Sequence, residues 1–258
     1  MDILKFARGG ATKLLLLGLL LSAPKAQAQI SVFFQPEYFV WQEFVDGRKV
    51  LEESGPRFVL GATYKMESDD RGFLFGAQLK GYYGEVGYDG ETQTGTPVET
   101  TTQYYGGLGE VRGFYRAFAG KKYFLDVVGS LGVEGWRRSI YGDGGYIEEW
   151  VIGYGKLGVE LDPRANGWLG SVGIKYPFYT DEVARLSKFG LPDIQLHPGK
   201  QPSLYFEGGY QFTKNFSVLA VFDSYWFDES DVESAGSVGF FQPKSRNYVA
   251  GLKLQWTF

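Results

Sequence analysis

The stretch Tyr248-Val-Ala-Gly-Leu-Lys-Leu-Gln-Trp-Thr-Phe258 places an apolar or small residue at every second position. Successive side chains of a β-strand point to opposite faces, so this period of two predicts a strand with one apolar and one polar face. The apolar face carries Tyr248, Ala250, Leu252, Leu254, Trp256 and Phe258. The opposite face carries Val249, Gly251, Lys253, Gln255 and Thr257.

The same alternation recurs through the chain from Ile30 onward, with almost no helical periodicity. It predicts ten strands, at residues 31–44, 55–66, 72–87, 101–118, 123–138, 147–161, 167–178, 202–212, 216–227 and 246–258. Most are long enough to cross the hydrocarbon layer of a bilayer at a tilt.

The connections between these strands alternate in length. The short ones are Glu67–Arg71, Ala119–Lys122, Asp162–Asn166 and Thr213–Asn215. The long ones are Val45–Ser54, Tyr88–Thr100, Ser139–Tyr146, Tyr179–Gln201 and Asp228–Ser245. This layout is typical of an all-β, ten-stranded antiparallel transmembrane β-barrel with short periplasmic turns and long extracellular loops. A lipocalin-like barrel or a β-sandwich would need an apolar interior, whereas here the charges gather on one face of the strands and leave the other face apolar.

Composition excludes several other classes of protein. The chain has 258 residues, 17% of them aromatic, and no cysteine, which excludes a disordered chain, a disulfide scaffold and a cysteine-ligated zinc site. The net charge of -4 provides no basic surface, so we expect no nucleic acid partner.

The N-terminal segment has the features of a secretory signal peptide. A basic start is followed by an apolar run at Leu14–Leu21, too short to span a bilayer, and then by the small-x-small pattern of Ala26 and Ala28. We therefore predict a signal peptide at residues 1–28, cleaved after Ala28, and one barrel domain at residues 29–258.

The last strand resembles the C-terminal signature of Gram-negative outer-membrane β-barrel proteins. The resemblance rests on the alternation of Tyr248, Leu252, Leu254 and Trp256 and on the terminal Phe258. It implies an integral outer-membrane location, recognition of this segment by the barrel-assembly machinery, and contact with outer-membrane lipid and lipopolysaccharide. In strand number the chain resembles the omptin proteases. The segment from Lys175 to Tyr210 also resembles poorly characterised proteobacterial outer-membrane barrels.

Aromatic residues cluster at both ends of the apolar face, as expected where amphipathic rings meet lipid headgroups. Those near the short turns are Phe34, Tyr64, Phe73, Tyr115, Tyr123, Trp168, Phe212, Phe216 and Trp256. Those near the long loops are Tyr83, Tyr105, Tyr176, Phe178, Trp226 and Tyr248.

Alternation assigns eight acidic and eight basic residues to the lumen. The acids are Glu37, Glu43, Glu110, Asp126, Glu134, Glu160, Glu207 and Asp223. The bases are Arg57, Lys80, Arg112, Arg116, Arg138, Lys156, Lys175 and Lys253. Opposite charges confined in a narrow barrel should pair, which predicts a polar plug. Lumen glycines at positions 106, 132, 158, 209 and 251 should make room for long neighbouring side chains.

Catalytic motifs find little support. The resemblance to omptins implies an Asp-x-His element, but Gln195 stands two residues before the single histidine, His197. The His-x-Ser element of barrel lipid A deacylases is absent too, because Pro198 and Gly199 follow His197. We expect no catalytic residue, although an acid–base pair of carboxyl groups stays open.

Two further motifs indicate neither a cofactor nor a metal. The sequence from Gly153 to Gly158 fits G-x-G-x-x-G by letter, but a strand pattern continues through it where a dinucleotide site needs a helix. The acidic cluster at 228–233 does not have EF-hand spacing, and a solvated loop explains it.

These patterns favour a non-enzymatic outer-membrane barrel with a charge-plugged lumen and a structural or surface-interaction role carried by its loops. The alternatives are a narrow porin-like channel for small solutes or ions, and a barrel enzyme with an unrecognised site.

Overall fold

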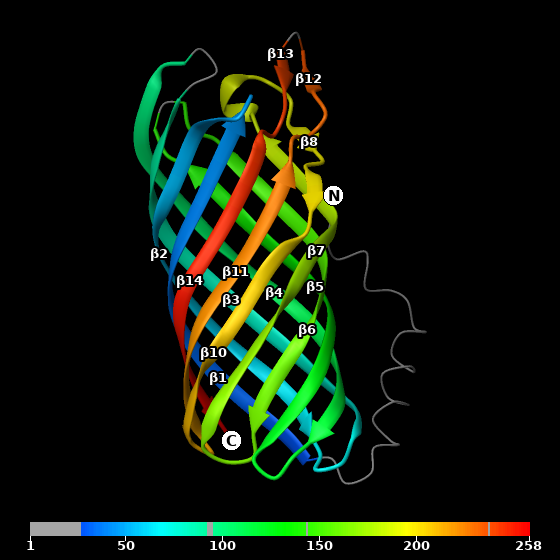
Figure 1. Cartoon of the computed structure of the whole chain (residues 1–258). Coiled ribbons are helices and arrows are strands. Elements are labelled where there is room, and N and C mark those ends of the chain that lie inside the picture. The colour runs from blue at the N-terminus through cyan, green and yellow to red at the C-terminus, as the bar shows by residue number, and fades with distance from the viewer. Residues whose placement is uncertain (1–26, 92–94, 143, 237) are drawn as a thin grey trace, which may run out of the picture.

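The computed structural model describes residues 27–91, 95–142, 144–236 and 238–258, which form a closed antiparallel β-barrel (Figure 1). The barrel strands are β1 (Gln27–Val45), β2 (Arg48–Glu67), β3 (Gly72–Glu91), β4 (Pro97–Ala119), β5 (Tyr123–Ile140), β6 (Ile147–Pro163), β7 (Gly167–Arg185), β10 (Ser203–Thr213), β11 (Phe216–Asp228) and β14 (Lys244–Thr257). Each pairs with the next, β7 pairs with β10, and β14 pairs with β1 to close the barrel. The prediction of ten antiparallel strands is confirmed.

The upper loops hold the remaining elements. The β7–β10 connection contains the 3-10 turn η2 (Ser187–Phe189) and the short strands β8 (Ile194–Leu196) and β9 (Gly199–Gln201). The β11–β14 connection folds into a hairpin of β12 (Glu233–Ala235) and β13 (Val238–Phe240). Within the described ranges, no helix has the length and apolar composition needed to cross a membrane.

One predicted loop is wrong. The segment Val45–Ser54 is not a long connection, because β1 continues to Val45 and β2 starts at Arg48. Asp46 and Gly47 form the two-residue turn between them, with φ values of 50° and 78°. Positive φ at both central residues is the geometry of a type I′ hairpin turn, for which Asp-Gly is a preferred sequence.

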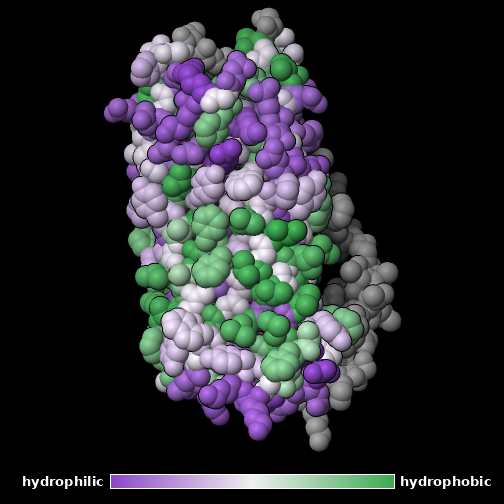
Figure 2. All heavy atoms as spheres, viewed as in Figure 1, coloured by the Kyte–Doolittle hydropathy of each residue, from purple (hydrophilic) through white to green (hydrophobic). Residues whose placement is uncertain are grey.

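The outer surface carries an apolar belt around the middle of the barrel (Figure 2). On β3 the belt runs from Phe73 to Tyr83, and Glu85 then begins a polar surface. On β5 it runs from Leu125 to Val133, with the charged Arg137 beyond it. Rings gather at its edges, for example in the chain of contacts formed by Trp168, Tyr210, Phe212, Phe216 and Trp256.

Glycines on the inner wall make room for large side chains of adjacent strands. A Cβ at Gly132 would collide with the ring of Tyr154, and one at Gly158 would collide with the hydroxyl of Tyr205. Gly106 lies in the same way against Tyr82 and Trp136. The interior is therefore narrow because rings and long chains fill the space that these glycines leave.

Candidate functional site

All sixteen charged residues that alternation assigns to the lumen lie on the inner face of the barrel. Each of them is buried or half-buried. They do not form one uniform layer. From the periplasmic end upward, the interior contains a lower charge network, a middle charge network, an aromatic layer and an acidic cluster at the extracellular mouth.

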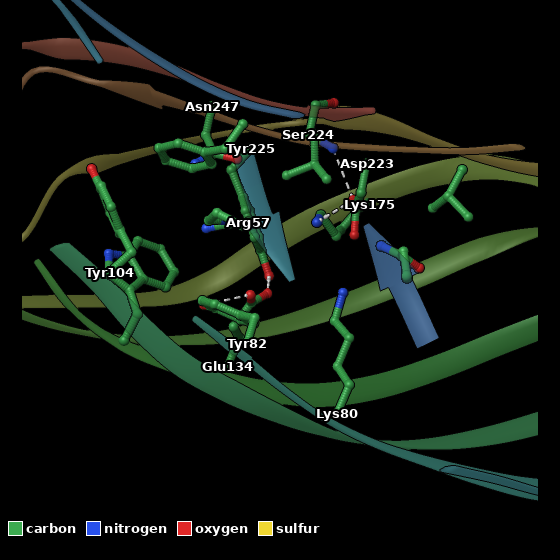
Figure 3. A pocket seen from close by; sticks show the side chains of 15 residues that line it. Arg57, Lys80, Tyr82, Tyr104, Glu134, Lys175, Asp223, Ser224, Tyr225 and Asn247 are labelled. Atoms are coloured by element: carbon green, nitrogen blue, oxygen red, sulfur yellow. Dashed lines mark hydrogen bonds and ion pairs between the residues drawn. The ribbon is translucent and has the colours of Figure 1, made fainter. Parts of the chain in front are cut away.

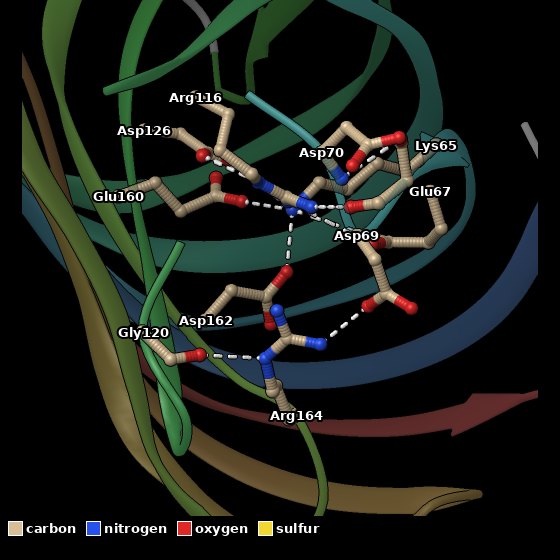
Figure 4. Close-up of polar contacts among 11 residues, drawn as sticks. Lys65, Glu67, Asp69, Asp70, Arg116, Gly120, Asp126, Glu160, Asp162 and Arg164 are labelled. Carbon is tan, nitrogen blue, oxygen red and sulfur yellow. Dashed lines mark hydrogen bonds and ion pairs between the residues drawn. The ribbon is translucent and has the colours of Figure 1, made fainter. Parts of the chain in front are cut away.

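The lower charge network, drawn in Figure 4, consists of Lys65, Glu67, Arg116, Asp126, Glu160 and Asp162. Lys65 Nζ lies 2.7 Å from Glu160 Oε1 and 2.5 Å from Asp162 Oδ2. Arg116 forms a bidentate salt bridge with Asp126, in which Nε and Nη2 each lie 3.0 Å from a carboxylate oxygen. The planar guanidinium suits this geometry, which fixes both side chains across β4 and β5.

The predicted lumen set lacks three members of this network, Lys65, Glu67 and Asp162. Lys65 has the same inward parity as Arg57, and the strand pattern that located Arg57 also includes it. Alternation places Glu67 and Asp162 in turns, but β2 continues to Glu67 and β6 continues to Pro163. Strand ends were therefore the weak point of the assignment.

The middle charge network is centred on Glu110. Arg112 Nε lies 2.6 Å from Glu110 Oε1, and Lys156 Nζ lies 3.0 Å from Glu110 Oε2. Lys253 pairs with Glu207, whose charge also acts on Arg112. One carboxylate thus holds two cations from different strands.

Above it, Arg57, Lys175 and Asp223 line a small cavity (Figure 3). Arg57 Nη2 lies 2.6 Å from Glu37 Oε1, and Lys175 pairs with Asp223. The cavity measures about 30 Å³, which is room for about two water molecules, and Lys80 also lines it.

Glu134 is held by hydroxyl groups. Tyr82 Oη donates to Glu134 Oε1 at 3.0 Å, and Tyr225 Oη donates to Glu134 Oε2 at 2.7 Å. A buried carboxylate with donors on both oxygens is satisfied without a neighbouring cation.

A second cavity, of about 100 Å³, lies between the lower and middle networks. Its wall includes Lys65, Arg112, Glu160, Glu207 and Lys253. None of the residues that line it also lines the smaller cavity near Lys80.

The upper part of the lumen differs from the prediction, because aromatic rings fill it. This aromatic layer consists of Phe39, Trp41, Tyr104, Trp136, Trp150 and Phe227, all of them buried. The ring centroids of Trp41 and Trp150 are 5.3 Å apart, and those of Trp136 and Trp150 are 5.4 Å apart. These separations are typical of packed aromatic cores. Charge pairing alone therefore does not describe how the lumen is filled.

The position of the aromatic layer along the barrel explains its composition. Trp136 pairs in register with Trp150, and the next outward-facing pair above them is Arg137 with Glu149. Charged outward residues mark a level above the apolar belt, where water replaces lipid outside the barrel. There the ordinary rule of an apolar core applies again.

The mouth cluster lies above the aromatic layer and contains Glu43, Glu53, Arg138, Glu148 and Glu182. Arg138 Nη2 lies 2.9 Å from Glu53 Oε1, and its Nη1 lies 2.8 Å from Glu148 Oε2 and 3.2 Å from Glu43 Oε1. One buried guanidinium thus binds three carboxylates. The predictions included Glu43 and Arg138 but missed the other three glutamates.

The aromatic layer and the mouth cluster are joined by hydrogen bonds. Trp41 Nε1 donates to Glu43 Oε1 at 2.8 Å, and Trp150 Nε1 donates to Glu148 Oε2 at 3.2 Å. Burial still dominates at Glu43, and it raises the pKa of that carboxyl group.

A hydrophobic cap covers the mouth cluster. It consists of Ala184, Leu186, Ile194, Leu196 and Ala235, which come from β7, β8, β12 and the β7–β10 connection. Leu196 on β8 pairs in register with Glu182 on β7, so the cap begins directly beside the mouth cluster.

The single histidine lies outside this interior. His197 has a side chain that is 61% exposed, and its Nδ1 lies 3.6 Å from Asp181 Oδ1. Gln195 Nε2 donates to the same Asp181 oxygen at 2.6 Å. Sequence spacing did not reveal this His–Asp proximity, because Asp181 lies on β7 whereas His197 lies in the connection between β8 and β9.

Comparisons with known proteins agree with this architecture. No family model and no curated protein matches the chain. The outer membrane protease OmpT from Escherichia coli has 12% identity, with 92% of this chain and 98% of that chain covered, at a TM-score of 0.53. The transport unit of the autotransporter AIDA-I from Escherichia coli has 11% identity, with coverages of 96% and 97%, at a TM-score of 0.46.

The likeness to OmpT shows the fold, a closed antiparallel barrel of the outer-membrane type. The apolar belt and the charged lumen of this chain give the physical reason for the location. An apolar exterior around a polar interior is stable only in lipid, so the chain is an integral outer-membrane barrel.

Proposed function

We propose that this protein is a non-enzymatic outer-membrane barrel with a closed lumen, acting structurally or through surface interactions of its extracellular loops. The observation that carries the proposal is the series of filled layers along the barrel axis. A solute would have to pass both charge networks, the aromatic layer and the mouth cluster.

The charge networks favour closure because their members are mutually bound. Moving an ion past Glu110 would require breaking its contacts with Arg112 and Lys156, which leaves buried charges without partners.

The aromatic layer favours closure for a different reason. Stacked rings such as Trp136 and Trp150 place mainly apolar surface in the path of a hydrated ion. The cavity below them, at about 30 Å³, holds about two water molecules and does not amount to a hydrated path.

The polar outer surface and the packed loops of the extracellular end support a role in surface interactions. The barrel wall continues above the apolar belt with a strongly polar outer surface (Figure 2). The β7–β10 and β11–β14 connections fold over the mouth and pack on each other in the hydrophobic cap. Ordered loops on a rigid wall are a common arrangement for binding.

Two partners belong to the same proposal. Outer-membrane lipid and lipopolysaccharide would contact the apolar belt and its aromatic edges. The barrel-assembly machinery would read the last strand, where Phe258 is 77% exposed and its backbone amide donates to Ile30 of β1.

Conductance in a planar bilayer tests the closed lumen. We expect purified wild-type protein to give no steady current at neutral pH. A steady single-channel current would overturn the closed barrel and favour the narrow channel for small solutes or ions.

Hydrolysis assays test the absence of catalysis. We expect no turnover of peptide or lipid A substrates. Turnover that is lost in His197→Ala or Asp181→Asn would instead identify a barrel enzyme that uses the His–Asp proximity at the rim.

A further inference from the structure

The mouth cluster contains more acid than its base can neutralise. Glu43, Glu53, Glu148 and Glu182 surround the single guanidinium of Arg138. All five residues are buried, with exposures between 0% and 7%. Four ionised carboxylates against one cation would leave uncompensated negative charge away from water, which is strongly unfavourable.

The carboxyl groups are not equally satisfied. Glu43, Glu53 and Glu148 each accept hydrogen bonds from Arg138 and from at least one further side chain. Glu182 is 1% exposed, and its Oε2 has no hydrogen-bond partner among the residues that the structure describes. The unfavourable charge therefore falls on Glu182.

The charged and titratable groups near Glu182 come from strands β1 to β7 and from Tyr146 before β6. Burial raises its pKa well above the ordinary value, and the negative charges of Glu148 and Glu43 raise it further, against the opposing effect of Arg138. The titratable and charged groups that face the cluster are Glu43 on β1, Glu53 on β2, Tyr88 on β3, Tyr104 on β4, Arg138 on β5, Tyr146 before β6, Glu148 on β6 and Asp181 on β7. The β8 and β12 strands add the apolar Leu196 and Ala235.

A metal ion does not fit this cluster. In the described part of the chain, no three Asp, Glu, His or Cys residues are arranged to hold one. Arg138 occupies the position between the carboxylates of Glu53 and Glu148 that a cation would need.

We propose that the mouth cluster is a proton-binding site in which Glu182 carries the proton at neutral pH, and that this proton keeps the hydrophobic cap seated on the barrel. The ligand is a proton from the external medium. The proposal concerns the mouth alone and is independent of whether the lumen conducts.

The cap is coupled to Glu182 through the backbone and through packing. Leu196 pairs with Glu182 in register, and Ala184 and Leu186 continue β7 and its connection directly above it. Thr180, one inward position below, donates to the carbonyl of Pro198 at 2.6 Å. An ionised Glu182 could be hydrated only if these contacts separate, so deprotonation should loosen the cap.

The direction of the pH effect follows from proton binding. A folded state with a raised carboxyl pKa holds its proton at pH values where the unfolded chain has lost it. Stability from this site therefore falls as pH rises from the ordinary value of 4.5 toward the raised pKa of Glu182. The cap should be closed at acidic and neutral pH and should open in alkali.

Acrylamide quenching of tryptophan fluorescence tests the proposal, because Trp41, Trp136 and Trp150 lie beneath the cap. In the full-length barrel, quenching should increase as pH rises from about 5 to about 10. Glu182→Gln, which mimics the protonated acid, should abolish this increase. Glu149→Gln, an outward-facing change on the same side of the barrel, should behave like the wild type.

Two results would overturn the proposal. One is an alkaline increase in quenching that persists unchanged in Glu182→Gln. The other is a wild-type barrel whose quenching does not increase in alkali. Infrared spectroscopy of the wild type gives a test that does not depend on a variant folding. A protonated carboxyl band at neutral pH that vanishes in alkali is expected, and its absence would refute the proton on Glu182.

Discussion

In the membrane-spanning part of the barrel the interior is charged and the exterior apolar, whereas above the membrane the interior is aromatic and the exterior charged. β5 contains both arrangements. Val127 and Leu131 face lipid while Asp126 lies inside, but higher on the same strand Trp136 lies inside and Arg137 faces out. The solvent outside the wall changes along the axis, and the chemistry of the two faces reverses with it.

The two ends of the lumen differ in hydration as well. In the lower charge network the pair of Arg116 and Asp126 is fully buried, but the side chains of Lys65, Glu67 and Asp162 are 14–25% exposed. In the mouth cluster the side chains of Arg138, Glu53 and Glu148 are at most 1% exposed. Substitutions in the mouth cluster should therefore have larger consequences than substitutions of the partly exposed Lys65, Glu67 or Asp162.

The largest effect is expected for Arg138→Ala. It leaves the mouth carboxylates without their cation, and removing one partner of a buried ion pair costs about 3–5 kcal/mol. Denaturant unfolding in detergent measures the loss. Arg185→Ala removes pairs with Glu149 and Asp193, in which all three side chains are far more exposed, and it serves as the matched control. Equal losses for the two variants would contradict the distinction between buried and exposed networks.

Val127→Arg should have the next largest effect. Val127 faces lipid on β5, and a charge in that position is expected to cost about 2–4 kcal/mol. Ser130 lies on the same strand but faces the lumen, so Ser130→Arg should be tolerated better. Folded yield and unfolding free energy of the two variants provide the comparison, and equal tolerance would show that the faces are wrongly assigned.

The smallest effect is expected for Arg164→Ala at the periplasmic rim. Arg164 pairs with Asp69, whose side chain is 82% exposed, and such surface pairs contribute about 0–1 kcal/mol. A loss as large as that of Arg138→Ala would mean that the periplasmic turns share the rigidity of the mouth.

The sequence was most informative where the environment is uniform. Alternation located all ten barrel strands and the inward-facing charges from Glu37 to Lys253, because lipid outside and a confined lumen inside impose a strict period of two. Alternation failed at the extracellular ends of the strands. There the outer face passes from lipid into water, so the expectation of an apolar exterior and a charged interior no longer applies. The sequence did contain a signal, because the inward-facing positions change from charged to apolar residues at Trp41, Trp136 and Trp150.

Two other misses have local causes. The Asp46-Gly47 turn was hidden by charged residues on both sides of it, although its sequence is a strong hairpin signal. Glu53, Glu148 and Glu182 fell at or beyond the assumed strand ends, and their meeting at Arg138 depends on strands that are distant in sequence. The predicted signal peptide lies outside the described residues except for Gln27 and Ala28, which begin β1, and it stays a prediction.

We propose that charges below and rings above close the lumen in series. Single-channel recording on Arg112→Ala, Trp150→Ala and the double variant tests it most directly. Each single variant should show at most brief openings, because the other layer still blocks the path, and the double variant should conduct steadily. Steady conduction by Arg112→Ala alone would contradict the account, because the aromatic layer would then contribute nothing to closure.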